Sequence, residues 1–378
     1  MGSAIPSASE PGIERRLAHR RCFSAIGAGT AGAFLIALLA GCAAPRKLAY
    51  TADELRAEIH NRAPALADNV IIPFDVAPRD VALARQAVAS YIGPGEQVRG
   101  LVDALFDPTV FGLRYAPIVT ATAAQTLQTA EGNCLSLASV FVGLARGLGL
   151  KAYYLDASAL VGEVTHMDSS LVVNAGHITA VVEVDKWRWY LDFDRTLGSR
   201  LGSFRALDDI EAVAHFYNNR GYERIEWARQ GEQSIDWEAA ARDFETAAAV
   251  QPNFARAWNN LGIAYARLER QVDAERAYTR AIAADPKVSA PYNNLGTLYL
   301  HQGKVTEAVA ALRIAVRLEP DSAHAYLNLG RALITAHDVP AAVEALERAA
   351  ALHDKRASAL LGKLGRYQST HALERLER

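Results

Sequence analysis

The sequence predicts two folded parts, an α+β domain followed by an all-α superhelix of repeats. Leucine–glycine pairs recur every 34 residues in the C-terminal third, which is typical of stacked helical units. The middle segment instead combines one stretch of helical spacing with runs that alternate like strands. With 378 residues, of which 51% are hydrophobic, the chain is long enough to bury a core in each part.

Charge and cysteine content exclude several classes of protein. The formal net charge is −2, so we expect no nucleic acid partner, which would require a surplus or stripe of basic residues. Three cysteines are too few for a disulfide scaffold or a Cys-x-x-Cys zinc site. The sequence has neither HxxxH nor HExxH spacing and no glycine loop for phosphate, so we expect no metal and no cofactor.

The N-terminus has the pattern of an export signal. Basic residues 15–21 precede an apolar run from Phe23 to Ala40, and the run ends in Leu39-Ala40-Gly41-Cys42. A basic region, an apolar region and small residues at the cleavage position are typical of a secretory signal peptide. A membrane-spanning helix is the alternative, because about 18 apolar residues can cross a bilayer. The Gly and Ala residues that dilute the run favour the signal peptide.

Leu39-Ala40-Gly41-Cys42 resembles the lipobox of bacterial lipoproteins. The resemblance implies a signal peptide over residues 1–41, lipidation of Cys42 after cleavage, and a lipidated N-terminus with linker over 42–50. The protein would then lie in the cell envelope on the periplasmic side, attached to the membrane through its lipid anchor only. Ala43 rather than Asp follows the cysteine, which in relatives implies the outer membrane.

Cys134 lies at the predicted start of a helix. Cys22 would be lost with the leader and Cys42 acylated, so Cys134 would be the single remaining thiol. Helical spacing begins after Gly132-Asn133-Cys134, and a cysteine at a helix N-terminus meets the positive end of the dipole and backbone N–H groups. Both favour the thiolate, and the N–H groups could form part of an oxyanion hole. Further elements are predicted as helices at 52–63, 79–91 and 97–106 and a strand at 151–155.

A hairpin downstream supplies partners for this thiol. Residues 176–184 alternate like a strand, and after a turn residues 187–192 return as a second strand. This hairpin brings His177 and Asp192 onto neighbouring strands, so Cys134, His177 and Asp192 could act as nucleophile, general base and orienting carboxylate. Three alternatives stay open: His166, in a loop-like stretch, as the base; Asp194 as the carboxylate; and Cys134 as a buried packing residue.

These motifs resemble the transglutaminase-like cysteine-protease superfamily. Gly132-Asn133-Cys134 is similar to its helix start, residues 176–184 to its His strand, and 187–192 to its Trp-rich strand ending in Asp. The resemblance implies a papain-like α+β domain over residues 51–215 that acts on peptide or protein amides through a thioester. If water resolves this thioester, the protein is a protease or amidase. If a lysine or another amine resolves it, the protein forms cross-links. The Leu-Asp-Phe-Asp sequence at 191–194 departs from the family pattern.

The C-terminal third resembles the tetratricopeptide repeat (TPR). Leu261-Gly262, Leu295-Gly296 and Leu329-Gly330 recur at 34-residue spacing, with Tyr, Leu and Ala residues repeating around them. The resemblance implies a TPR array over residues 221–354, in which the first repeat is degenerate because Arg224 and Gly231 break the pattern. Residues 355–378 suit a capping helix. For such arrays the implied role is binding of a protein or peptide.

Asparagine recurs at the same spacing as the glycines. Asn260, Asn294 and Asn328 each stand two residues before the repeat glycine, so we expect them in register on the concave face. Amides placed there could bind the backbone of an extended peptide, although they could also hydrogen-bond within the repeat. The alternative to an enzyme is a non-catalytic assembly scaffold, in which the TPR array is the working part and the transglutaminase-like domain is degenerate.

Overall fold

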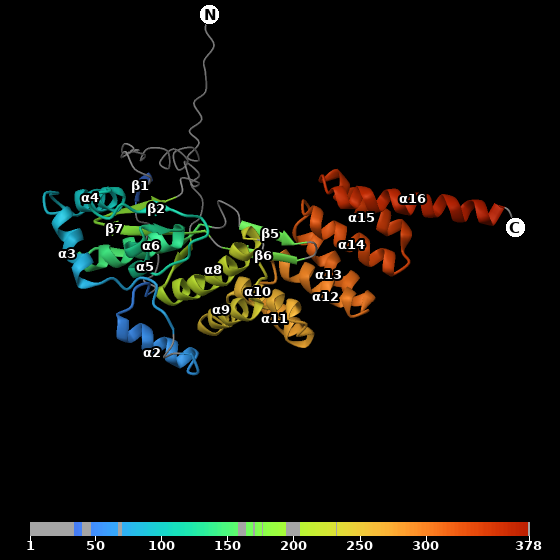
Figure 1. The fold of residues 1–378 in the computed structure, drawn as a ribbon, viewed down its shortest axis with the longest axis horizontal. Coiled ribbons are helices and arrows are strands. Elements are labelled where there is room, and N and C mark those ends of the chain that lie inside the picture. Colours follow the sequence, from blue (N-terminus) through green and yellow to red (C-terminus); the bar gives the residue numbers. More distant parts are fainter. Residues whose placement is uncertain are drawn as a thin grey trace, which may run out of the picture.

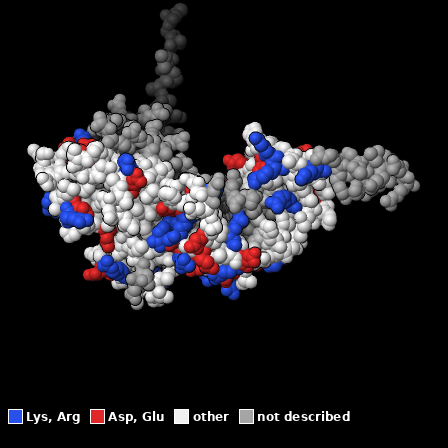
Figure 2. All heavy atoms as spheres, in the orientation of Figure 1, with Lys and Arg blue, Asp and Glu red and all other residues white. Residues whose placement is uncertain are grey.

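The computed structural model describes residues 34–39, 47–66, 70–157, 164–168, 171–175, 177–193, 205–231 and 233–376. An α+β domain lies at one end, and a row of paired helices leads from it to the C-terminal helix at the other end (Figure 1). No helix within these ranges is long and apolar enough to cross a membrane. On the face in Figure 2, basic and acidic side chains are interspersed.

A five-stranded antiparallel sheet is the centre of the α+β domain. The strand order is β1-β8-β7-β4-β9. The predicted hairpin is confirmed, since β7 and β8 pair with Ala180 opposite Leu191. The bounds are β1 Phe34–Leu39, β4 Lys151–Asp156, β7 Ile178–Val184, β8 Trp187–Asp192 and β9 Arg205–Leu207. Edge strand β1 lies within the predicted leader, so in this structure part of the leader completes the sheet.

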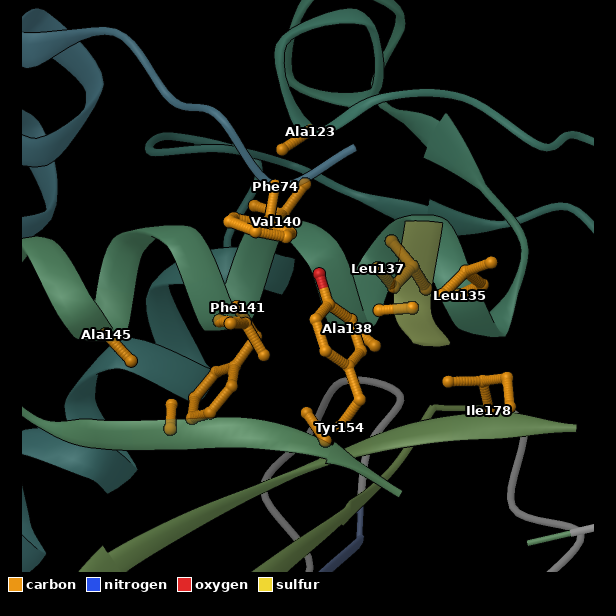
Figure 3. Packing of buried hydrophobic residues seen from close by; sticks show 14 of the residues in the cluster. Phe74, Ala123, Leu135, Leu137, Ala138, Val140, Phe141, Ala145, Tyr154 and Ile178 are labelled. Atoms are coloured by element: carbon orange, nitrogen blue, oxygen red, sulfur yellow. The ribbon is translucent and has the colours of Figure 1, made fainter. Parts of the chain in front are cut away.

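One buried helix covers this sheet and holds the core together. Helix α6, Cys134–Gly147, is buried along most of its length and lies on β4 and β7. Figure 3 shows Phe141 and Ala138 of this helix facing Tyr154 on the strand beneath. The other elements of the domain are α2 Ala52–Arg62, α3 Pro78–Ala87, α4 Pro94–Phe106, α5 Ala123–Thr129, β2 Arg114–Tyr115 and β3 Glu131–Gly132. The three helices predicted before Cys134 are therefore confirmed.

Helix α8, Asp209–Gln230, belongs to both parts of the molecule. Its first half contributes Ile210 and Phe216 to the core of the α+β domain, and its second half contributes Tyr222 to the core of the array. Asp209, fully buried, accepts two hydrogen bonds of 2.8 Å from Arg146 near the end of α6. Burial raises the pKa of Asp209, while the guanidinium favours its charged form. This ion pair ties the sheet-covering helix to the joining helix.

The array consists of four helical hairpins and a final helix. The hairpins are α8 with α9, α10 with α11, α12 with α13, and α14 with α15. Their bounds after α8 are α9 Trp237–Val250, α10 Ala255–Arg267, α11 Gln271–Ala284, α12 Ser289–His301, α13 Val305–Leu318, α14 Ala323–Thr335, α15 Val339–Ala351 and α16 Lys355–Leu376. The first helices, α8, α10, α12 and α14, touch from one hairpin to the next, so they line the inner, concave side.

The first repeat has the same contact between its two helices as the later repeats, although its sequence does not follow the 34-residue spacing. A Cβ at Gly262 would lie 2.5 Å from the ring of Tyr278, and a Cβ at Gly221 would lie 2.6 Å from the ring of Phe244. Gly221 is therefore the first repeat glycine, and the 34-residue register, which sets Arg224 and Gly231 at the positions of Trp258 and Tyr265, does not hold for the first repeat. Gly221 precedes Gly262 by 41 residues rather than 34, because α8 runs further past its glycine and the connection to α9 is longer.

We predict that removing Arg146 destabilises the whole chain. Arg146→Ala leaves the buried Asp209 carboxylate without its cation, which typically costs about 3–5 kcal/mol. Arg114→Ala is the matched control, because Arg114 pairs at 2.8 Å with Glu131 on the surface and should contribute at most about 1 kcal/mol. Denaturant unfolding measures both losses. Equal losses in the two variants would contradict the role given to the buried pair.

Candidate functional site

Cys134 is the first residue of α6 and is buried. Asn133 caps the helix, because its side-chain oxygen accepts a hydrogen bond of 3.0 Å from the N–H of Ser136. Gly132 allows this tight entry, since a Cβ there would lie 2.6 Å from the Cβ of Ser136. The expected helix start is therefore confirmed, and the thiol lies at the positive end of the helix dipole.

The loop before α5 is held against this helix start from two sides. The Asn133 amide donates to the Thr120 hydroxyl at 2.8 Å, and the Thr120 N–H donates to Glu223 on α8 at 2.7 Å. Burial raises the pKa of Glu223. Trp227 on the same helix donates to the Ile118 carbonyl at 3.1 Å. Helix α8 therefore positions the loop before α5, which lies next to Cys134 in the fold. The sequence carries no pattern that predicts this contact.

His177 and Cys134 lie at the same end of the helix–sheet layer. His177 is buried and directly precedes β7, and its carbonyl accepts from the Ala157 N–H at 2.9 Å. Figure 3 shows Leu135, at the start of α6, above Ile178, at the start of β7. The residue before each of these is a candidate catalytic residue. The start of α6 and the start of β7 therefore lie at the same end of this layer, and a contact between Cys134 and His177 stays a prediction.

The backbone register of the sheet places Asp192 on the strand next to the one that His177 precedes. Asp192 is the last residue of β8, and continuing the β7–β8 pairing places it opposite Thr179 and diagonal to His177. The Thr179 hydroxyl donates to the Leu191 carbonyl, which joins the two strands at this end. Asp194, the alternative carboxylate, lies outside the described residues, as does the lipidation candidate Cys42. Asp192 and Asp194 therefore both remain predictions.

His166, the alternative base, lies in a strand rather than the expected loop. Strand β5, Val164–Asp168, pairs antiparallel with β6, Leu171–Ala175, and His166 is opposite Val173. This two-stranded hairpin is separate from the five-stranded sheet and lies against the helical array (Figure 1). The expectation of a loop is wrong because the apolar run 171–175 supplies a second strand for residues 164–168. Among the described residues, no three acidic, His or Cys side chains form a metal-binding group.

The predicted peptide-binding asparagines form a buried chain of amides. Asn260, Asn294 and Asn328 are at most 2% exposed, and Asn294 is also among the residues that line an open cavity of about 560 Å³. Each donates at 2.9 Å to an asparagine of the preceding unit. A second asparagine in the first three units continues the line, giving the donor-to-acceptor order Asn328, Asn293, Asn294, Asn259, Asn260, Asn218 and Asn219.

The line of amides corrects the expectation for the first repeat, while peptide binding by Asn260, Asn294 and Asn328 stays a prediction. The three asparagines hydrogen-bond within the array, which is the alternative role that the sequence left open. The first repeat also carries the motif, since Asn218-Asn219-Arg220-Gly221 matches Asn259-Asn260-Leu261-Gly262. The recurring Asn-Asn-x-Gly could have located this repeat, but its 41-residue spacing falls outside a search at 34 residues.

Comparison with known proteins identifies relatives of the helical array only. Residues 233–289 and 293–367 match the tetratricopeptide repeat family. The crystal structure of MamA is 20% identical with a TM-score of 0.32, over 40% of this chain and 92% of that chain. The first TPR of Spaghetti bound to an HSP90 peptide is 23% identical with a TM-score of 0.30, over 30% of this chain and 93% of that chain. No curated protein matches. The predicted TPR repeats are confirmed, and with them a protein-binding module.

We predict that position within the amide chain decides the cost of losing an asparagine. Asn294→Leu breaks two side-chain bonds, to Asn259 and from Asn293, whereas Asn328→Leu at the end of the chain breaks only the bond to Asn293. Each buried bond lost should cost about 1–3 kcal/mol. The free energy of unfolding should therefore fall about twice as far for the first variant, and similar losses would contradict a connected chain.

Proposed function

We propose that this protein is a lipid-anchored component of the bacterial cell envelope that joins a thiol-dependent acyl-transfer domain to its TPR module. The enzymatic part is supported by the arrangement of two elements: α6, which begins with Cys134, and β7, which directly follows His177, start at the same end of one layer. A thiol at a helix N-terminus beside a histidine is the arrangement that activates a cysteine nucleophile. The TPR array would bring the peptide or protein substrate to this end.

The reaction would run through a thioester on Cys134. His177 would take the thiol proton while Sγ attacks an amide carbonyl, and it would return that proton to the amine as the C–N bond breaks. The carboxylate, proposed as Asp192, would hold the imidazole orientation. Backbone N–H groups at the start of α6 would stabilise the oxyanion. A water molecule would then release an acid, whereas a lysine amine would form a new amide and so a cross-link.

Alkylation of Cys134 tests the thiol–imidazole pair without knowledge of the substrate. We expect iodoacetamide to modify Cys134 readily below pH 7, because the reactive form is the thiolate that His177 would stabilise. His177→Ala should slow this reaction at least ten-fold. His166→Ala is the matched control, since that histidine lies on the separate β5–β6 hairpin, and should leave the rate unchanged.

Two outcomes would overturn the enzymatic proposal. One is an alkylation rate that neither histidine affects. The other is full turnover of labelled casein by Cys134→Ala, where dansylcadaverine incorporation reports transfer to an amine and fragment release reports hydrolysis. Either outcome would favour the non-catalytic scaffold, in which the array alone performs the function.

Lipidation is proposed from Leu39-Ala40-Gly41-Cys42 and is tested separately. Cys42→Ala should abolish labelling by radioactive palmitate and leave the precursor uncleaved, whereas Cys22→Ala in the leader should keep both label and cleavage. Fractionation should place the wild-type protein in the outer membrane. A processed wild-type protein without label, found in the soluble fraction, would contradict the lipid anchor.

A further inference from the structure

Strand β1 closes one edge of the five-stranded sheet, and it belongs to the predicted leader. Residues Phe34–Leu39 pair antiparallel with all six residues of β8. Cleavage before Cys42 would remove the whole of β1 from the chain. The processed protein would then keep the strand order β8-β7-β4-β9, and the backbone N–H and C=O groups on the outer side of β8 would lose their partners.

The two edges of the remaining four-stranded sheet differ in their protection. Strand β9, at one edge, is only three residues long, and a short edge strand offers little backbone for another chain to pair with. Strand β8, at the other edge, is six residues long, contains no proline and is rich in Trp and Tyr, which favour strands. Its one basic residue, Arg188, is held by Glu183 of the same sheet at 3.0 Å. Loss of the leader would therefore expose the longer edge, which lacks these protections.

Strand β8 can pair antiparallel with the same strand of a second copy. Successive residues direct their backbone groups to opposite sides of a strand, so two residues can face each other across a two-fold axis only if their numbers differ by an even number. An axis at Tyr190 meets this condition and sets Trp189 opposite Leu191 of the partner subunit. It also sets Arg188 opposite Asp192 of the partner subunit, and facing positions of opposite charge stabilise paired strands. An axis at Trp189 would give no such charge pair.

The proposed lipid anchor is compatible with this pairing. The two-fold axis of an antiparallel strand pair is perpendicular to the sheet, so the same face of the sheet points the same way in both copies. Leu48 packs with Tyr153 and Val181 on the face that α6 does not cover. Cys42 precedes Leu48 by six residues, which span at most about 20 Å. Both anchors would therefore lie on one side of the dimer, where they can enter the same membrane.

We propose that the processed protein forms a two-fold symmetric dimer in which β8 pairs antiparallel with β8 of a second copy, and that β1 prevents this pairing in the precursor. Four strands from each copy would form one continuous sheet. The proposal rests on the proposed cleavage before Cys42 but not on the thiol chemistry. Assembly would thus begin only after the protein has been processed and anchored.

Cysteine cross-linking in isolated membranes tests the position of the axis. Tyr190→Cys is placed in a background with Cys22→Ala and Cys134→Ser, so that residue 190 carries the only free thiol once Cys42 is acylated. Oxidation with copper phenanthroline should give a disulfide-linked dimer, because facing Cα atoms of antiparallel strands lie about 5 Å apart. Arg188→Cys is the matched control: its two copies would be offset by about 13 Å along the strands, so it should cross-link at least ten-fold more slowly.

The effect of the leader is tested in the same background. Adding Cys42→Ala keeps the leader and with it β1, so cross-linking through Tyr190→Cys should fall at least ten-fold. Equal cross-linking of Tyr190→Cys and Arg188→Cys, or equal cross-linking with and without the leader, would overturn the proposal.

A second measurement needs no engineered cysteine. Sedimentation in mild detergent should show a dimer for the processed wild type and for Tyr190→Phe, and a monomer for Tyr190→Lys, because like charges would face each other at the axis. Cleavage is followed separately by gel mobility. A processed protein that is monomeric contradicts the pairing, whereas an unprocessed wild-type protein contradicts the lipid anchor on which the pairing rests.

Discussion

The bidentate ion pair between Arg146 and Asp209 is the contact on which the arrangement of the two parts depends. It joins the end of α6 to the first turn of α8, and the Tyr50 N–H donates to the same carboxylate at 2.9 Å. A buried charge is tolerated only where such partners compensate its desolvation. Because α8 is also the first helix of the array, this one pair fixes where the repeats start relative to the sheet.

The same helix reaches the candidate site through its second half. Glu223 and Trp227 hold the loop that contacts Asn133, the cap of the helix that begins with Cys134. A short series of hydrogen bonds, rather than a flexible linker, connects the first repeat to the start of α6. A local shift of the first repeat would therefore change the surroundings of the Cys134 thiol. Helix α8 is both the first helix of the array and the helix that holds the loop beside Cys134, so the proposed binding and catalytic roles would be coupled through it.

Short-range patterns were sufficient to predict most elements, and long-range contacts account for what was missed. The α6 start and the β7–β8 hairpin follow from spacing and turn residues, both of which are local. Residues 164–168 gave no strand signal although their partner strand begins only three residues later, whereas the helices that this partner strand contacts come from elsewhere in the chain. Arg224 obscured the first repeat, and in the structure it pairs, together with Arg220, with the buried Asp243 of α9. The buried charge of this group is the Asp243 carboxylate, and its two cationic partners on α8 are not evident from the sequence of α9 alone.

The amide chain through the array has a direction, and direction restricts how such an array can change. Between units each amide donates to the preceding unit, and within a unit the first asparagine donates to the second. Inverting any interior amide would therefore set donor against donor and acceptor against acceptor at its two neighbours. The orientations of all the amides from Asn328 to Asn219 therefore depend on one another. Inserting or deleting one whole helical hairpin would keep the series of hydrogen-bonded amides continuous. Shifting one first helix by a single helical turn would interrupt it. Change in the length of this array is in effect limited to whole repeats.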